Sequence, residues 1–70
     1  HFRGNIMTPA EIRALRLARG WSRADMSRRL DPPVDRTTIW RWETGRTHPE
    51  RWELAQLREW ADQIESSEGE

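Results

Sequence analysis

The stretch from Asp35 to Gly45 combines residues that could read a nucleic acid with residues that could anchor them. It begins with Asp, which favours helix N-caps, and ends with Gly, which favours helix C-termini. A helical period gives it an apolar face that contains Ile39 and Trp42. The opposite face carries Arg36, Thr37, Trp40 and Arg41. A short helix with an arginine-bearing face fits the DNA major groove, where Arg can donate two hydrogen bonds to a guanine edge.

Residue types that most enzymes and metal sites need are scarce in this chain. There is no Cys, the two histidines are His1 and His48, and no glycine-rich phosphate loop is present. These residues offer neither a nucleophile with a base nor a cluster of metal ligands. We therefore predict a protein that is not an enzyme and that uses no metal, cofactor or small-molecule substrate.

No apolar run approaches the roughly 20 residues that a membrane helix needs, and no signal peptide is evident. We expect no membrane partner and a cytoplasmic, nucleoid-associated protein.

The net charge is zero, but the charges are unevenly distributed along the chain. Residues 1–48 hold ten arginines and five acidic residues, a balance of +5, whereas residues 49–70 hold two arginines and seven acidic residues, a balance of −5. A dipolar molecule of this kind can meet phosphate at its basic end. Every basic residue is Arg, whose planar guanidinium suits bidentate contacts.

Capping and stop signals predict four helices. A capping box at Thr8-Pro9-Ala10-Glu11 opens a helix over about 9–19, which Gly20 ends. Ser22 opens the second helix and Asp31-Pro32-Pro33 ends it. The third helix is the stretch from Asp35 to Gly45, and Thr47-His48-Pro49-Glu50 opens a fourth that frays near Ile64.

No segment alternates with period two, so we expect no strand. The fold class predicted is all-α, a compact domain of four to five helices. The apolar residues expected to face its core are Ile12, Leu15, Leu17, Ala24, Met26, Leu30, Ile39, Trp42, Leu54, Leu57, Ala61 and Ile64.

We expect one domain over residues 7–64, followed by an acidic tail over residues 65–70. Residues 1–6 lack a periodic pattern, so we interpret them as an expression leader and Met7 as the native start. The alternative is an ordered native N-terminus in which Phe2 and Ile6 pack.

Residues 9–61 resemble the Cro/phage-repressor type of helix-turn-helix domain, the XRE-like group. The resemblance rests on residues 12–22, on residues 38–46, and on Pro49 followed by Leu54, Leu57 and Ala61. Its most specific part is the run Ile-x-x-Trp-Glu-x-Gly, and it implies a lambda-repressor-like fold. Two features depart from the family: Arg23 stands where Gln is usual, and the turn containing Asp31-Pro32-Pro33-Val34 is longer than usual.

The resemblance implies base contacts at the positions of Arg36, Thr37 and Arg41. Trp40 stands where small or polar residues are common; we include it among the base-contacting candidates, with a sugar, a thymine methyl or a protein partner as open alternatives. The alternative for Arg36 and Arg41 is a solvated surface.

For the backbone phosphates we assign four contacts, which set position but not sequence. They are Ser22, Arg23, Arg46 and Thr47. Ser22 could instead be only a cap, and Arg28 and Arg29 are expected to be solvated. The resemblance also implies an ion pair between Arg16 and Glu43, which would orient the recognition helix.

The neighbouring residues in the sequence predict different positions for the tryptophans. We expect Trp42 in the core and Trp21 against the start of the second helix. Of Trp52 and Trp60, we expect Trp60 to lie on a dimer surface, because an exposed apolar patch on a small domain usually marks an interface.

These observations predict a sequence-specific transcriptional regulator, a repressor of the phage or mobile-element type. It would bind an inverted-repeat operator in double-stranded DNA as a homodimer, with helix 35–45 in the major groove. The alternative is a protein-interaction module or antitoxin-like partner that uses Trp40 and the acidic fourth helix on the same scaffold.

Overall fold

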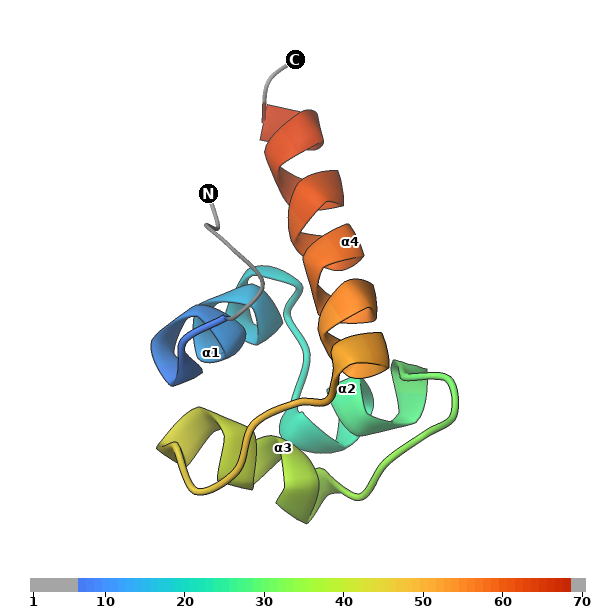
Figure 1. The fold of residues 1–70 in the computed structure, drawn as a ribbon. Helices are drawn as coiled ribbons and strands as arrows, with labels where there is room; N and C mark the ends of the chain where they lie inside the picture. The colour runs from blue at the N-terminus through green and yellow to red at the C-terminus, as the bar shows by residue number, and fades with distance from the viewer. Residues whose placement is uncertain (1–6, 69–70) are drawn as a thin grey trace.

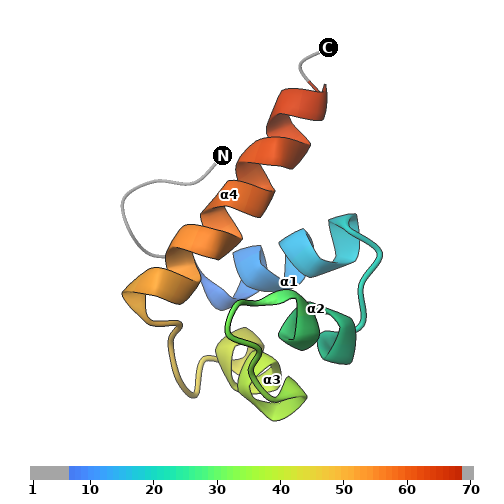
Figure 2. The same cartoon turned by 90° about the vertical axis from the view of Figure 1, so that its right-hand side faces the viewer.

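The computed structural model describes residues 7–68. Their four helices are α1 (Pro9–Ala18), α2 (Arg23–Arg29), α3 (Arg36–Thr44) and α4 (Arg51–Glu68) (Figure 1). Helices α1 to α3 form a small body, and α4 packs on it through side chains between Glu53 and Ile64 (Figures 1 and 2). In both views the C-terminal end of α4 projects beyond the other helices, away from α3. Residues 7–68 contain no strand, which confirms the predicted all-α fold class.

Local capping explains where α1 and α2 begin. The Thr8 hydroxyl accepts from the Glu11 backbone N–H at 3.1 Å, and Glu11 Oε1 accepts from the Thr8 N–H at 2.7 Å. Ser22 and Asp25 form the same reciprocal pair at the start of α2. Both pairs satisfy N–H groups that a helix start leaves without a backbone partner. After α1, the chain turns at Gly20, whose φ of 73° favours glycine.

The predicted capping box at Thr47 and Glu50 is wrong. Helix α4 begins at Arg51, and the Glu50 N–H donates to Glu53 Oε1 at 2.8 Å. Pro49 is buried, so it packs into the body instead of opening the helix. The predicted fraying near Ile64 is also wrong, because α4 continues to Glu68. Residues 65–68 contain neither Gly nor Pro, so the local sequence permits the longer helix.

The core lies where α1, α2, α3 and the first three turns of α4 meet. Its buried residues are Met7, Ile12, Leu15, Met26, Leu30, Ile39, Trp42, Leu57 and Ala61. The predicted core position of Trp42 is therefore confirmed. Leu17, expected in the core, is 53% exposed, because the helical period turns it away from the face shared by Ile12, Leu15 and Arg16.

Two of the remaining expected core residues, Leu54 and Ile64, are partly buried and pack against this core; Ala24 is also only partly buried.

Aromatic packing joins α4 to the turn after α1. The Trp21 and Trp60 rings meet edge to face, with their centroids 5.1 Å apart. The guanidinium of Arg29, at the end of α2, lies 4.8 Å from the Trp21 ring centroid. The sequence did not predict the contact of Trp21 with α4. Trp60 is partly buried, and its place on a dimer surface stays a prediction. The more exposed of the two tryptophans on α4 is Trp52, at 39%.

The turn between α2 and α3 is tied to α4 by one side chain. Gln56 Oε1 accepts from the Asp31 N–H at 3.0 Å, and Gln56 Nε2 donates to the Asp31 carbonyl at 2.8 Å. This pair satisfies both backbone groups of a residue next to a proline. It holds the lengthened turn against the body and thereby helps to set where α3 begins.

Replacing Gln56 with Ala is expected to lower the free energy of unfolding by about 1–2 kcal/mol, because it removes two exposed hydrogen bonds. Urea denaturation measures the change. A matched control is Glu59→Ala, which shortens an exposed side chain further along the same helix. Faster amide exchange at Asp31 in the Gln56 variant would locate the effect in the turn, and unchanged exchange there would contradict this role.

Candidate nucleic-acid interface

Helices α2 and α3 and the turn between them form a helix-turn-helix arrangement (Figure 1). The turn closes when the Val34 N–H donates to the Ser27 carbonyl at 3.1 Å, and Val34 packs against the core. The Asp35 carboxylate then accepts from the Thr37 N–H at 3.2 Å and caps α3. Gly45 ends α3 with a φ of 82°. Although this turn is longer than usual, α3 still begins after Asp35 and ends before Gly45, as the sequence predicts.

The two faces of α3 are divided as the sequence predicts. Ile39 and Trp42 are 0% and 2% exposed and point into the core. The four candidate base-contacting residues, Arg36, Thr37, Trp40 and Arg41, are all exposed. Since the buried face is anchored by a large aromatic ring, the exposed face is held in a defined direction.

A groove of about 570 Å³ separates the start of α2 from the first two turns of α3. It is lined by Arg16, Ser22, Arg23, Ala24, Arg36, Thr37 and Trp40. Two of the predicted phosphate-contacting residues thus share one hollow with three of the predicted base-contacting residues. The other three predicted contacts, Arg41, Arg46 and Thr47, lie outside this lining, toward and beyond the C-terminal end of α3.

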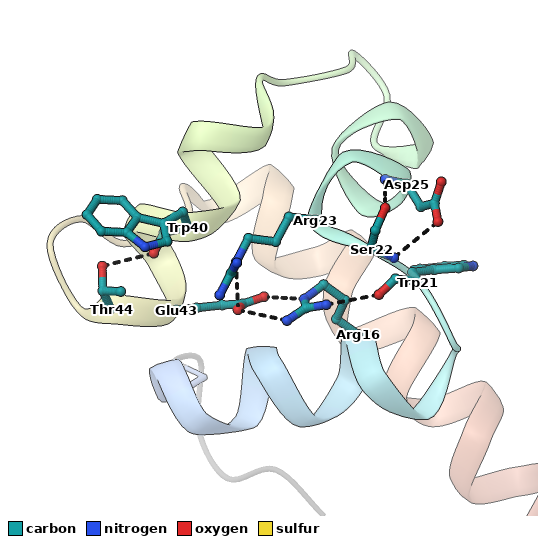
Figure 3. Close-up of polar contacts among 8 residues, drawn as sticks. All are labelled: Arg16, Trp21, Ser22, Arg23, Asp25, Trp40, Glu43 and Thr44. Carbon is teal, nitrogen blue, oxygen red and sulfur yellow. Dashed lines mark hydrogen bonds and ion pairs between the residues drawn. The ribbon is translucent and has the colours of Figure 1, made fainter.

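One carboxylate joins three elements behind this groove. Glu43 Oε2 accepts from Arg16 Nε at 2.6 Å, and Glu43 Oε1 accepts from Arg16 Nη2 at 3.2 Å and from Arg23 Nε at 3.3 Å (Figure 3). Arg16 Nη1 also donates to the Trp21 carbonyl at 3.0 Å. The Glu43 side chain is 1% exposed and that of Arg16 is 9% exposed. The pair between Arg16 and Glu43 that the resemblance implied is present in the structure.

The second arginine on Glu43 was missed by the sequence analysis. Its signal was available, since Arg23 stands where the resembled family usually has Gln. Only Nε of Arg23 is bound to Glu43, and 42% of its side chain is exposed at the groove. Arg23 can therefore keep its remaining N–H donors for a ligand while Glu43 holds its inner end.

Ser22 has a defined structural task at the same place. Its hydroxyl accepts from the Asp25 N–H at 3.1 Å, and its own N–H donates to Asp25 Oδ2 at 3.1 Å. The cap that the sequence offered as the alternative role for Ser22 is thus present. Ser22 is also exposed and lines the groove, so capping leaves its position open to a phosphate.

Two caps make the fold sensitive to acid. Hydrogen bonds from the Ser22 backbone N–H and hydroxyl lower the pKa of Asp25 below its ordinary value of 3.8. The Thr37 hydroxyl and backbone N–H do the same to the pKa of Asp35. Because both folded pKa values lie below the unfolded values, this stabilisation is present above about pH 4 and is lost as pH falls through the folded values.

We expect the double variant Asp25→Asn and Asp35→Asn to lose less of its Tm between pH 5 and pH 2 than the original chain does. At the N-cap position of Asp35, Asn caps a helix about as well as Asp does, and at position 25 an Asn side-chain oxygen can still accept from the Ser22 N–H. Asn does not titrate in this range. Thermal unfolding followed by circular dichroism at each pH measures the two slopes. Equal slopes would show that these caps carry none of the acid sensitivity.

Beyond α3, the chain folds back along the helix. The Arg46 N–H donates to the Arg41 carbonyl at 2.9 Å, and the Thr47 N–H contacts the same carbonyl at 3.4 Å. The Arg46 guanidinium lies over the Trp40 ring, 5.0 Å from its centroid. The structure thus places Arg46 beside the exposed face of α3 without bringing it into the groove.

A family model described as a helix-turn-helix domain matches residues 10–62, which are 53 of the 70 residues. The chain belongs to the helix-turn-helix family. This family indicates a DNA-binding regulator in general terms, and the matched range contains the groove, α3 and the first part of α4. Searches among curated proteins and among solved structures found no match.

Within the described part of this helix-turn-helix protein, His, Asp and Glu side chains form no group that could hold a metal ion. None of the helices there is long and apolar enough to cross a membrane.

Proposed function

We propose that this helix-turn-helix protein is a sequence-specific transcriptional regulator that inserts α3 into the major groove of DNA. The observation that carries the proposal is the exposed face of α3, where Arg36, Thr37 and Arg41 stand opposite two core anchors. Bidentate donation by Arg to a guanine and contact of the Thr methyl with a thymine are ordinary ways of reading base edges. The resemblance to Cro-like, XRE-type domains favours a repressor of the phage or mobile-element type.

Phosphate contacts would flank these base contacts on two sides. Ser22 and Arg23 lie across the groove from α3, and Arg46 and Thr47 follow its C-terminal end. Contacts to two separated stretches of backbone would fix the depth and tilt of α3 without reading sequence. The C-terminal end of α4 projects away from α3 (Figure 2), so DNA bound at α3 would lie on the opposite side of the molecule.

We propose further that the protein binds an inverted repeat as a homodimer. One α3 presents few base-reading side chains, and a single small module buries too little surface for high specificity. Two copies related by a two-fold axis would read half-sites one helical turn apart, about 34–36 Å along the duplex. Such pairing doubles both the base contacts and the phosphate contacts.

Salt dependence separates DNA binding from the alternative of a protein-interaction module. For a duplex ligand, the logarithm of the affinity should fall linearly with the logarithm of salt concentration, by about 0.9 per phosphate neutralised. The variant Arg23→Ala should reduce this slope by about one unit. The control Arg58→Ala removes the same charge from α4, and its slope should match that of the original chain.

The proposal would be overturned if the chain bound no duplex at low salt. A slope that Arg23→Ala and Arg58→Ala reduce equally would remove Arg23 from the interface.

A further inference from the structure

Trp40 is an exposed aromatic residue on the face of α3 that should meet DNA. Its side chain is 38% exposed, although the same helix buries Trp42 almost completely. The helical period places Trp40 between Arg36 and Arg41 on the polar face, where no core contact requires an indole. A large ring at this position is therefore not explained by packing of the core.

The chain after α3 brings a cation onto this ring. Gly45 adopts a φ of 82°, and the Arg46 N–H then donates to the Arg41 carbonyl at 2.9 Å. The Thr44 hydroxyl donates to the Trp40 carbonyl at 2.9 Å, which ties the last turn of α3 together. This backbone path lets the Arg46 guanidinium lie 5.0 Å from the Trp40 ring centroid.

A guanidinium over the face of an aromatic ring is attracted by the ring's electrons, so this contact needs no hydrogen-bond acceptor. The contact therefore orders a long side chain without using its hydrogen-bond donors. Ordering such a side chain otherwise opposes binding, because its rotamers must be frozen when the ligand arrives. The Trp40 ring can remove this cost before DNA is met.

We propose that Trp40 is a positioning residue that holds Arg46 ready for a backbone phosphate at the C-terminal end of α3. The inference rests on the proposed DNA-binding function and assigns Trp40 a task within it. Trp40 then acts through Arg46, so its contribution to affinity depends on Arg46 being present. A base-reading or purely structural Trp40 would contribute equally with and without Arg46.

A double-mutant cycle on duplex binding tests this dependence. The variants are Trp40→Leu, Arg46→Gln and the two combined, measured by fluorescence anisotropy with one labelled duplex at fixed salt. Leu keeps an apolar side chain but has no ring face, so Trp40→Leu should weaken binding about two- to fivefold when Arg46 is present. In the Arg46→Gln background, the same change should leave the affinity unaltered.

Trp40→Phe is the conservative variant, because it retains a smaller ring face. It should bind more tightly than Trp40→Leu in the chain that contains Arg46. Equal losses from Trp40→Leu in both backgrounds, or equal affinities of the Phe and Leu variants, would overturn the inference while leaving the proposed function in place. If the unmodified chain failed to bind the duplex, the proposed function would fall as well.

The contact between Arg46 and Trp40 can also be tested in the free protein, without DNA. The side-chain protons of Arg46 should show an upfield ring-current shift by NMR, and Trp40→Leu should abolish it. Because Trp40 is exposed, this variant should unfold at nearly the same temperature as the original chain. The absence of a ring-current shift in the original chain would contradict the preformed contact.

Discussion

Replacing Glu43 with Ala is expected to lower the free energy of unfolding by about 3–5 kcal/mol. The change removes the carboxylate that Arg16 and Arg23 share, and it leaves Arg16 charged with 9% of its side chain exposed. A buried charge without its partner costs far more than an intact buried pair contributes. For a domain of this size the loss is a large share of the total stability, and urea denaturation would measure it.

Two variants show whether the loss comes from the stranded charge. Glu59→Ala removes an exposed carboxylate from α4 and should change stability by less than about 0.5 kcal/mol. Combining Arg16→Met with Glu43→Leu replaces the pair with apolar side chains, and this double variant should be more stable than Glu43→Ala. If Glu43→Ala and Glu59→Ala were equally stable, Glu43 would not have the central structural role that its contacts indicate.

Replacing Arg36 or Arg41 with Ala is expected to relax base preference at particular positions of the bound site. Each arginine is exposed on α3, where a bidentate contact to guanine contributes about 1–3 kcal/mol of discrimination. Relative affinities for duplexes that differ at one base pair should therefore converge by about 5- to 150-fold at the positions affected. Competition binding against a panel of single-base variants measures this convergence.

The effects of these variants across the panel distinguish base-specific recognition from sequence-independent attraction to the phosphates. Arg23→Ala should weaken binding to all duplexes of the panel by a similar factor, since phosphate contacts carry no sequence information. Arg58→Ala, on the exposed side of α4, should leave the whole panel unchanged. If Arg36→Ala and Arg41→Ala behaved like Arg23→Ala, their assignment to base edges would be withdrawn.

Local signals predicted much of the fold because they act within one turn of chain. The caps at Thr8, Ser22 and Asp35 and the turns at Gly20 and Gly45 all lie where the sequence placed them. The start of α4 escaped the same reasoning, since Pro49 is buried ahead of the helix, which begins at Arg51.

In the candidate site, too, the sequence predicted the features that depend on local spacing but not those that depend on tertiary contacts. The faces of α3 follow from a helical period, so Arg36 and Trp42 could be assigned to opposite sides from sequence. The contact of Arg46 with Trp40 could not, because it joins residues across the turn at Gly45, where no helical spacing applies. The sharing of Glu43 by two arginines likewise depends on how three helices meet, and only Arg16 was indicated by resemblance.

Selection of bound sites from a pool of random duplexes tests the central claim most directly. The account predicts enrichment of an inverted repeat whose half-sites are centred about 10–10.5 base pairs apart or a multiple of that spacing. Guanines should recur within each half-site, at positions where Arg36→Ala or Arg41→Ala relaxes the preference. A bound pool with no enriched sequence, although it binds at low salt, would contradict sequence-specific recognition by α3.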